Sequence, residues 1–101
     1  MARESLLQLV RAHRDEVQAA VERHRGLTFA VFGSVVRGDD TDTSDIDFLV
    51  RFASGSSLFD VLHLSDELER ILGRQVDVVS EGGLTARDQH ILEEAVRVES
   101  I

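Results

Sequence analysis

The chain has 101 residues, a formal net charge of −8, and neither cysteine nor tyrosine. This length supports one domain, residues 1–101, with a modest core, and the acidic balance argues against a nucleic-acid-binding surface, which needs clustered positive charge. The absence of cysteine excludes disulfides and thiolate chemistry, and the absence of lysine excludes Schiff-base catalysis and the P-loop.

The first predicted element is a helix from about Ser5 to Arg25, because apolar residues recur along it at helical spacing. Gly26 is expected to follow the C-cap of this helix. His13 and His24 fall near the apolar face, and we interpret them as partly buried histidines with hydrogen-bond partners rather than as ligands. The chain has no run of about 18 apolar residues and no apolar core of a signal peptide, so we expect a cytoplasmic protein without a membrane segment.

Leu27 to Phe32 forms a continuous apolar run that predicts the first strand. The run stops at Gly33-Ser34, a pair that suits a sharp turn. Gly33 would let the backbone approach a phosphate closely, and Ser34 adds a small hydroxyl donor. A Gly-Ser pair alone is an ordinary turn, so its meaning depends on the residues that follow.

The second predicted strand runs from Asp45 to Phe52. Side chains two apart in a strand share a face, so Asp45 and Asp47 are expected to point one way, whereas Ile46, Phe48 and Val50 point the other. Two carboxylates whose Cα atoms are roughly 6.5 to 7 Å apart repel each other, and a divalent cation resolves that conflict. Mg²⁺ is usually held by carboxylates together with substrate phosphates, so the pair indicates a phosphate-bearing substrate. The alternative is the ordinary polar face of an edge strand.

A second helix is predicted from about Ser57 to Leu72, and Gly73 is expected to end it. Phe59 falls on the polar side of this helix, where it is either a partner contact or a ring folded over the helix end. The apolar residues expected to face inward are Leu58, Val61, Leu62, Leu64, Leu68, Ile71 and Leu72.

Residues 75–79 predict a third strand, in which Asp77 is flanked by valines on the opposite face. Three convergent aspartates can bind two metal ions roughly 4 Å apart, an arrangement that stabilises both oxygens of a phosphoryl displacement. A last helix is expected from about Thr85 to Ala95, followed by a short extended segment over residues 96–98. This order of elements predicts an α/β domain in which helices cover a small mixed sheet.

The spacing of these residues resembles the signature of the nucleotidyltransferase superfamily. Gly33-Ser34 is followed by ten intervening residues and then by Asp45-x-Asp47, and the run Gly33-Ser-Val-Val-Arg37-Gly38 resembles the form found in its minimal, single-domain members. Those members are antitoxins that occur beside HEPN-domain toxins. The resemblance covers most of the chain and implies a single-domain nucleotidyltransferase fold.

The resemblance also implies roles for individual residues. Gly33 and Ser34 would bind the triphosphate of ATP, Asp45 and Asp47 would bind Mg²⁺, and Asp77 would help to activate the acceptor hydroxyl. Arg37 either contacts phosphate or pairs with one of the nearby aspartates, because arginine suits both partners.

Two function classes remain open. The first is a Mg²⁺-dependent transferase that moves AMP from ATP to a tyrosine of a HEPN toxin and so acts as an antitoxin. The second is an inactive binding antitoxin that occludes its partner and keeps the site as a remnant. Because the chain contains no tyrosine, a tyrosine acceptor must be supplied by another protein.

Overall fold

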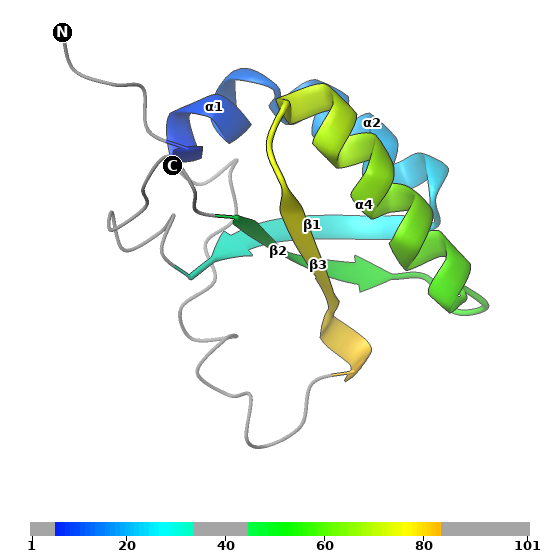
Figure 1. Cartoon of the computed structure of the whole chain (residues 1–101). Coiled ribbons are helices and arrows are strands. Elements are labelled where there is room, and N and C mark those ends of the chain that lie inside the picture. Colours follow the sequence, from blue (N-terminus) through cyan, green and yellow to red (C-terminus); the bar gives the residue numbers. More distant parts are fainter. Residues whose placement is uncertain (1–5, 34–44, 84–101) are drawn as a thin grey trace, which may run out of the picture.

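The computed structural model describes residues 6–33 and 45–83. Within them, a mixed sheet has the strand order β1-β2-β3, in which β1 (Gly26–Phe32) is antiparallel to β2 (Ile46–Phe52) and β2 is parallel to β3 (Val76–Ser80). The helices α2 (Arg14–Arg23) and α4 (Leu58–Leu72) lie on one face of this sheet (Figure 1). The predicted α/β architecture with a small mixed sheet is therefore confirmed.

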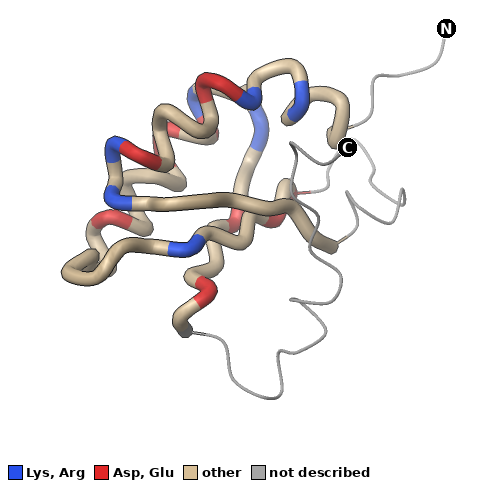
Figure 2. The backbone as a smooth tube through the Cα atoms, turned by 180° about the vertical axis from the view of Figure 1, so that it is seen from behind, with Lys and Arg blue, Asp and Glu red and all other residues tan. Residues whose placement is uncertain are grey.

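The main core lies between the sheet and the two helices. Ile46, Phe48 and Val50 on β2 are fully buried there, which confirms that these three side chains face away from Asp47. The rings of Phe29 and Phe48 are in contact, with centroids 6.0 Å apart. β1 carries no charged residue, whereas β2 and β3 carry theirs near the strand ends (Figure 2). Charge is therefore kept out of the middle of the sheet.

The single N-terminal helix predicted from Ser5 to Arg25 is wrong, since α1 (Leu6–Ala12) and α2 are separate helices. In a continuous helix, the backbone N–H of His13 would donate to the carbonyl oxygen of Leu9. Here that N–H donates to the carbonyl oxygen of Val10 at 3.1 Å, and Nδ1 of the His13 ring donates to Leu9 at 3.0 Å. The side chain thus replaces the backbone donor and allows the chain to turn.

The sequence predicted that Gly26 would follow the C-cap of the first helix, but the structure shows that glycine is needed here for packing. His24 is the C-cap of α2, and Arg25 adopts the left-handed conformation with φ of 65°. A Cβ atom at Gly26 would lie 2.3 Å from Cγ1 of Val21. Only glycine therefore allows β1 to start directly against the end of α2.

α4 begins and ends with strong local signals. The backbone N–H of Ser57 donates to Oδ2 of Asp60 at 2.9 Å, and Gly73 ends the helix in the left-handed conformation with φ of 67°, as predicted. Its buried face carries Leu64, Leu68 and Leu72. The first turn extends past the end of β2 (Figure 1), so the expectation that Leu58 and Leu62 face the core is wrong.

Some predicted elements lie outside the described residues. These are the turn at Ser34, Arg37 and the loop that follows it, and the helix and extended segment expected after Thr85. The described chain ends in a short 3₁₀ helix, η1 (Glu81–Gly83). Among the described helices, none has the length and apolar character needed to cross a membrane.

Candidate active site

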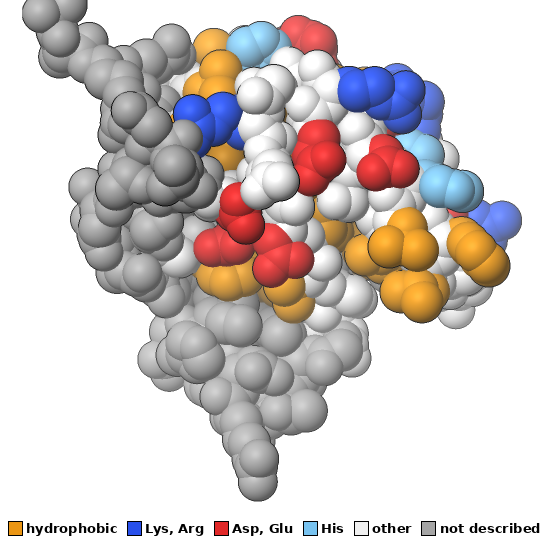
Figure 3. All heavy atoms as spheres, viewed as in Figure 1, with side chains coloured by type: hydrophobic (Ala, Val, Ile, Leu, Met, Phe, Trp, Pro, Cys, Tyr) orange, Lys and Arg blue, Asp and Glu red, His pale blue; other side chains and the backbone are white. Residues whose placement is uncertain are grey.

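The predicted carboxylates come together where β2 and β3 begin. Asp47 of β2 is the direct register partner of Asp77 of β3 in the parallel pair. Neighbouring strands lie about 4.8 Å apart, and paired residues present their side chains on the same face. Asp45 comes directly before β2, and Figure 3 shows acidic side chains gathered over this edge of the sheet. The structure thus places Asp47 and Asp77 side by side, and Asp45 lies two residues before Asp47 in the chain.

Two hydrogen bonds hold the starts of these strands in place. The backbone N–H of Ile46 donates to the carbonyl oxygen of Gln75 at 3.0 Å, which joins the beginnings of β2 and β3. The backbone N–H of Val76 donates to Oε2 of Glu69 at 3.2 Å, which ties β3 to α4. Glu69 and Gln75 therefore fix the starts of β2 and β3, where Asp47 and Asp77 lie. Sequence reasoning missed both, and a glutamate on a helix carries no signal that would reveal such a role.

Gly33 lies directly against the carboxylate of Asp47. It follows Phe32, the register partner of Asp47, and adopts a left-handed conformation with φ of 78°. A Cβ atom at this position would lie only 2.4 Å from Oδ2 of Asp47. Any side chain here would thus be strained by the backbone and would also collide with the carboxylate. Gly33 therefore contacts the aspartate that the same motif contains, and its close approach to a phosphate stays a prediction.

The burial of the three aspartates differs. Asp47 is partly buried beside Gly33, whereas Asp45 and Asp77 are exposed to solvent. An exposed side chain can turn toward a ligand at low cost. The site therefore combines one carboxylate held by the fold with two that are free to meet a cation or a substrate.

The donor set suits a hard divalent cation, although no complete binding shell is preformed. No three His, Asp or Glu side chains of residues 6–33 and 45–83 converge closely enough to hold a metal ion alone. Mg²⁺ rarely requires such a cage, because one or two carboxylates hold it together with water and substrate phosphates. Adjacent carboxylate oxygens that face open solvent fit that coordination.

A small apolar cluster shares the face that carries the aspartates. It consists of Ala30, Phe32 and Leu49, with Val79 packed against them, and the register places it directly beside Asp47 and Asp77. The sheet therefore has an apolar surface on both faces. The signal was present in the four consecutive apolar residues Phe29 to Phe32 of β1, since strands covered on both faces lack polar alternation.

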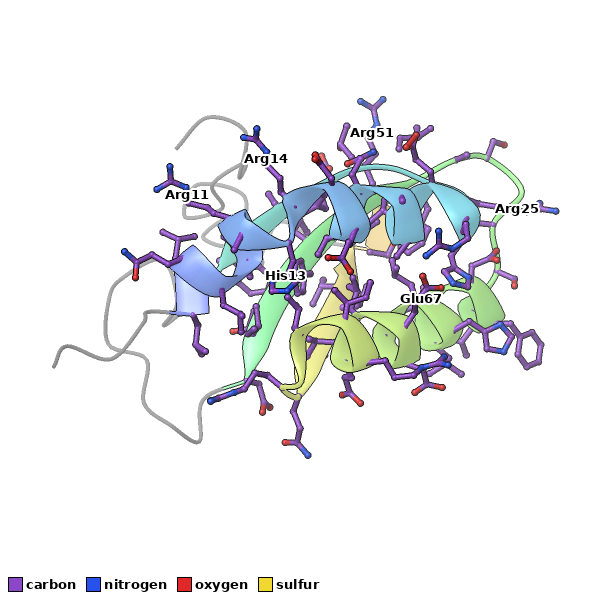
Figure 4. All side chains as sticks on the ribbon, turned by 90° about the horizontal axis from the view of Figure 1, so that it is seen from above. Arg11, His13, Arg14, Arg25, Arg51 and Glu67 are labelled. Carbon is purple, nitrogen blue, oxygen red and sulfur yellow. The ribbon has the colours of Figure 1, made fainter. Side chains whose placement is uncertain are left out.

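His13 and His24 both have hydrogen-bond partners within the described part of the chain. Nε2 of His24 lies 2.9 Å from Oε1 of Glu67, and Arg23 also pairs with Glu67, so the end of α2 is joined to the middle of α4. Figure 4 shows Glu67 between these two helices. Burial, followed by the nearby charges of His63 and Arg23, lowers the pKa of His24. The interpretation of His13 and His24 as partnered histidines is confirmed.

Comparison with known proteins relates this chain to a known family. The nucleotidyltransferase domain family matches residues 10–98. A Thermococcus cleftensis protein, the protein adenylyltransferase MntA, is 37% identical over 81 residues, which is 80% of this chain and 79% of that protein. A Methanocaldococcus jannaschii protein that bears the provisional name of a protein adenylyltransferase is 44% identical over 70 residues, which is 68% of this chain and 75% of the relative.

Solved structures show the same fold. A minimal nucleotidyltransferase structure superimposes with a TM-score of 0.79 at 43% identity, covering 89% of this chain and 93% of that one. The Shewanella oneidensis complex of a tri-AMPylated HEPN toxin with an MNT antitoxin contains a chain that superimposes with a TM-score of 0.65. That chain is 18% identical, and the match covers 92% of this protein and 71% of its own length. At that identity, the second match shows a shared fold.

Proposed function

Since this chain belongs to the nucleotidyltransferase family of enzymes, we propose that it transfers AMP from ATP to a hydroxyl group of a partner protein. The observation that carries this proposal is the direct pairing of Asp47 with Asp77, with Gly33 packed against the carboxylate of Asp47. Carboxylates at the edge of a sheet, next to a turn that tolerates close backbone approach, suit a metal-bound triphosphate.

The three aspartates have separate roles in this proposal. Asp45 and Asp47 hold Mg²⁺, and Asp77 contributes to the same site while orienting the acceptor hydroxyl and receiving its proton. When bound, one or two Mg²⁺ ions would offset the negative charge of the phosphates and polarise the phosphoryl group that the hydroxyl attacks. As the new bond to the α-phosphorus forms, the bond from that phosphorus to the bridging oxygen breaks and pyrophosphate leaves. Ser34 and Arg37 lie outside the described residues, and their contact with the triphosphate remains part of the proposal.

The acceptor is a tyrosine of a HEPN-domain toxin, and the chain acts as the antitoxin in the cytoplasm. Two observations support this assignment. The chain has no tyrosine of its own, so a tyrosine acceptor must come from another protein. A protein with the same fold stands in complex with an AMPylated HEPN toxin. In this proposal, the toxin loses its activity because it is covalently modified, not because the bound antitoxin occludes it.

Intact-mass measurement of both proteins after incubation with ATP and Mg²⁺ tests this function. We expect added adenylyl mass on the toxin and none on the antitoxin. Asp47→Asn should abolish the added mass, whereas the matched control Asp66→Asn, an exposed aspartate on α4, should leave it unchanged. If the toxin is inhibited without gaining mass, occlusion by an inactive antitoxin replaces the enzymatic proposal.

A further inference from the structure

The first turn of α4 exposes a concentrated apolar surface. Leu58, Phe59 and Leu62, which we call the α4 patch, are 71%, 70% and 52% exposed. Four large hydrophobic side chains of the described residues are exposed to this degree, and the α4 patch holds three of them within five positions of one helix. Figure 3 shows hydrophobic side chains gathered on the surface over this end of α4. Single exposed apolar residues are ordinary, but a contiguous group indicates a binding surface.

The α4 patch is not needed to form or to anchor the helix. The start of α4 is set by the bond from Ser57 to Asp60, and its core contacts are made by the buried leucines of the second half. The patch side chains therefore add little to folding, and in the free protein they expose apolar area to water at a cost. A bound partner would remove that cost.

Basic side chains border the α4 patch on the side of α2. The ring of His63 lies between the patch and α2, with its centroid 6.4 Å from that of Phe59 and 6.3 Å from that of His24. Nη1 of Arg25 donates to the carbonyl oxygen of Gly55 in the loop before α4, and Figure 4 shows the Arg25 side chain extending outward at this end.

Two acidic side chains near the α4 patch already have partners within the protein. Asp60 accepts the bond that caps the helix, and Glu67 pairs with Arg23 and His24. In a chain with a net charge of −8, Arg25 is a positive charge at this border that pairs with no carboxylate of the described residues. Charge complementarity selects a partner whose apolar side chains are flanked by Asp or Glu.

The size of the patch argues against a second copy of this chain as its occupant. Three large side chains of this kind offer about half of the roughly 800 Å² that each partner buries in a stable interface. They are instead sufficient as the central anchor of a larger contact with another protein, where a few apolar residues supply most of the binding energy.

We propose that the α4 patch is the docking surface for the acceptor protein, which presents apolar side chains flanked by carboxylates to it. This inference rests on the proposed function, because it identifies the patch's partner with the protein that is modified. α4 has 15 residues, and a helix of that length spans about 22 Å. The patch is at the start of α4, whereas Asp77 lies at the start of β3, which follows the end of α4, so the patch and Asp77 are near opposite ends of this helix.

Binding measurements without ATP test the docking surface separately from catalysis. The probe is a purified HEPN-domain toxin, chosen as one whose toxicity is suppressed by co-expression of the wild-type chain. The test protein carries Phe59→Gln and Leu62→Gln, which keep good helix formers in α4. The matched control is Leu27→Gln, which makes the same chemical change at a side chain that is 50% exposed on β1.

We expect the double variant to bind the toxin about 30-fold more weakly by calorimetry, while the Leu27→Gln control binds like the wild type. Affinity for ATP with Mg²⁺ should be unchanged in both. Circular dichroism checks the fold, and Phe59→Gln alone replaces the double variant if that protein unfolds.

Three results would overturn the docking inference. The patch variant could bind the toxin as tightly as the wild type does, or the Leu27→Gln control could lose as much affinity as the patch variant. The wild-type chain could also fail to suppress the toxicity of any HEPN-domain toxin. Toxin binding that depends on the α4 patch without any transfer of AMP would instead refute the proposed function and leave the docking surface standing.

Discussion

Replacing Gly33 with alanine tests whether the turn after β1 and the carboxylate of Asp47 form one unit. The substitution has two separate effects. It forces a residue with a Cβ atom to keep φ at 78°, and it places that atom 2.4 Å from Oδ2 of Asp47. The first effect concerns the backbone alone, whereas the second displaces a proposed metal ligand.

Gly73 provides a control that separates the two effects. It also has a left-handed backbone, with φ of 67°, but a Cβ atom there would meet nothing within 4 Å. The left-handed conformation costs a non-glycine residue roughly 1–2 kcal/mol, and the lower entropy of the unfolded alanine chain offsets roughly 0.4–1 kcal/mol of this. Gly73→Ala should therefore lower the free energy of unfolding by about 1 kcal/mol.

Gly33→Ala should cost more, because the Asp47 side chain must also leave its preferred rotamer. That adds roughly 0.5–1.5 kcal/mol, for a total loss of about 1–3 kcal/mol. In a domain of this size, each kcal/mol lowers the melting temperature by roughly 4–8 °C. Moving Asp47 should also weaken binding of ATP with Mg²⁺ by about 10- to 100-fold, whereas Gly73→Ala should leave that affinity unchanged.

Thermal unfolding and calorimetric titration with ATP and Mg²⁺ measure both effects. A double-mutant cycle with Asp47→Ala isolates the collision, because the atoms that the new Cβ would meet most closely are then absent. In that background, Gly33→Ala should cost only as much as Gly73→Ala. If Gly33→Ala matches Gly73→Ala in the wild-type background, in both stability and nucleotide affinity, the reasoning from the close approach is wrong.

Two further predictions concern the metal and His24. ATP should bind measurably with Mg²⁺ and much more weakly with EDTA, because carboxylates without a bound cation repel the triphosphate. Calorimetry measures both affinities, and equal values would show that the aspartates are not metal ligands. Burial, with the charges of His63 and Arg23, lowers the pKa of His24 below its usual value of 6.5, so the unfolded chain takes up a proton first as pH falls through 6.5. The free energy of unfolding should therefore decrease below that pH in denaturant titrations, and His24→Gln should flatten this dependence, whereas an unchanged slope would exclude His24 as its source.

Local rules predicted the parts of the fold whose causes are local. Alternation along residues 46–52 identified Ile46, Phe48 and Val50 as the buried side of β2 and Asp47 as lying opposite them, because successive side chains of a strand point in opposite directions. Gly73 was identified as the end of α4 because a left-handed residue at a helix end favours glycine. The break at His13 was missed, because helical periodicity continues across it. Only the structure shows that the His13 ring, rather than a backbone N–H, donates to the carbonyl oxygen of Leu9.

The exposure of Leu58 and Leu62 was also beyond local reasoning. Both residues occupy helical positions that favour burial, but burial requires another element to cover them. α4 extends past the sheet, so its first turn has the pattern of a buried helix without the neighbour that would bury it. The length of a helix relative to its sheet is a property of the assembled fold.

By itself, the sequence determined the chemical inventory of the site and the face on which each strand presents it. Asp47 points away from Ile46, Phe48 and Val50 because side chains alternate along a strand, and this holds wherever the strand is placed, whereas Asp45 lies just before β2 and its predicted face stays a prediction. Only the tertiary structure decided that Asp77 pairs with Asp47 and that Gly33 lies against the same carboxylate. Those contacts depend on strand register, which is set by how apolar faces and helices pack around the sheet, and no short stretch of sequence encodes that packing.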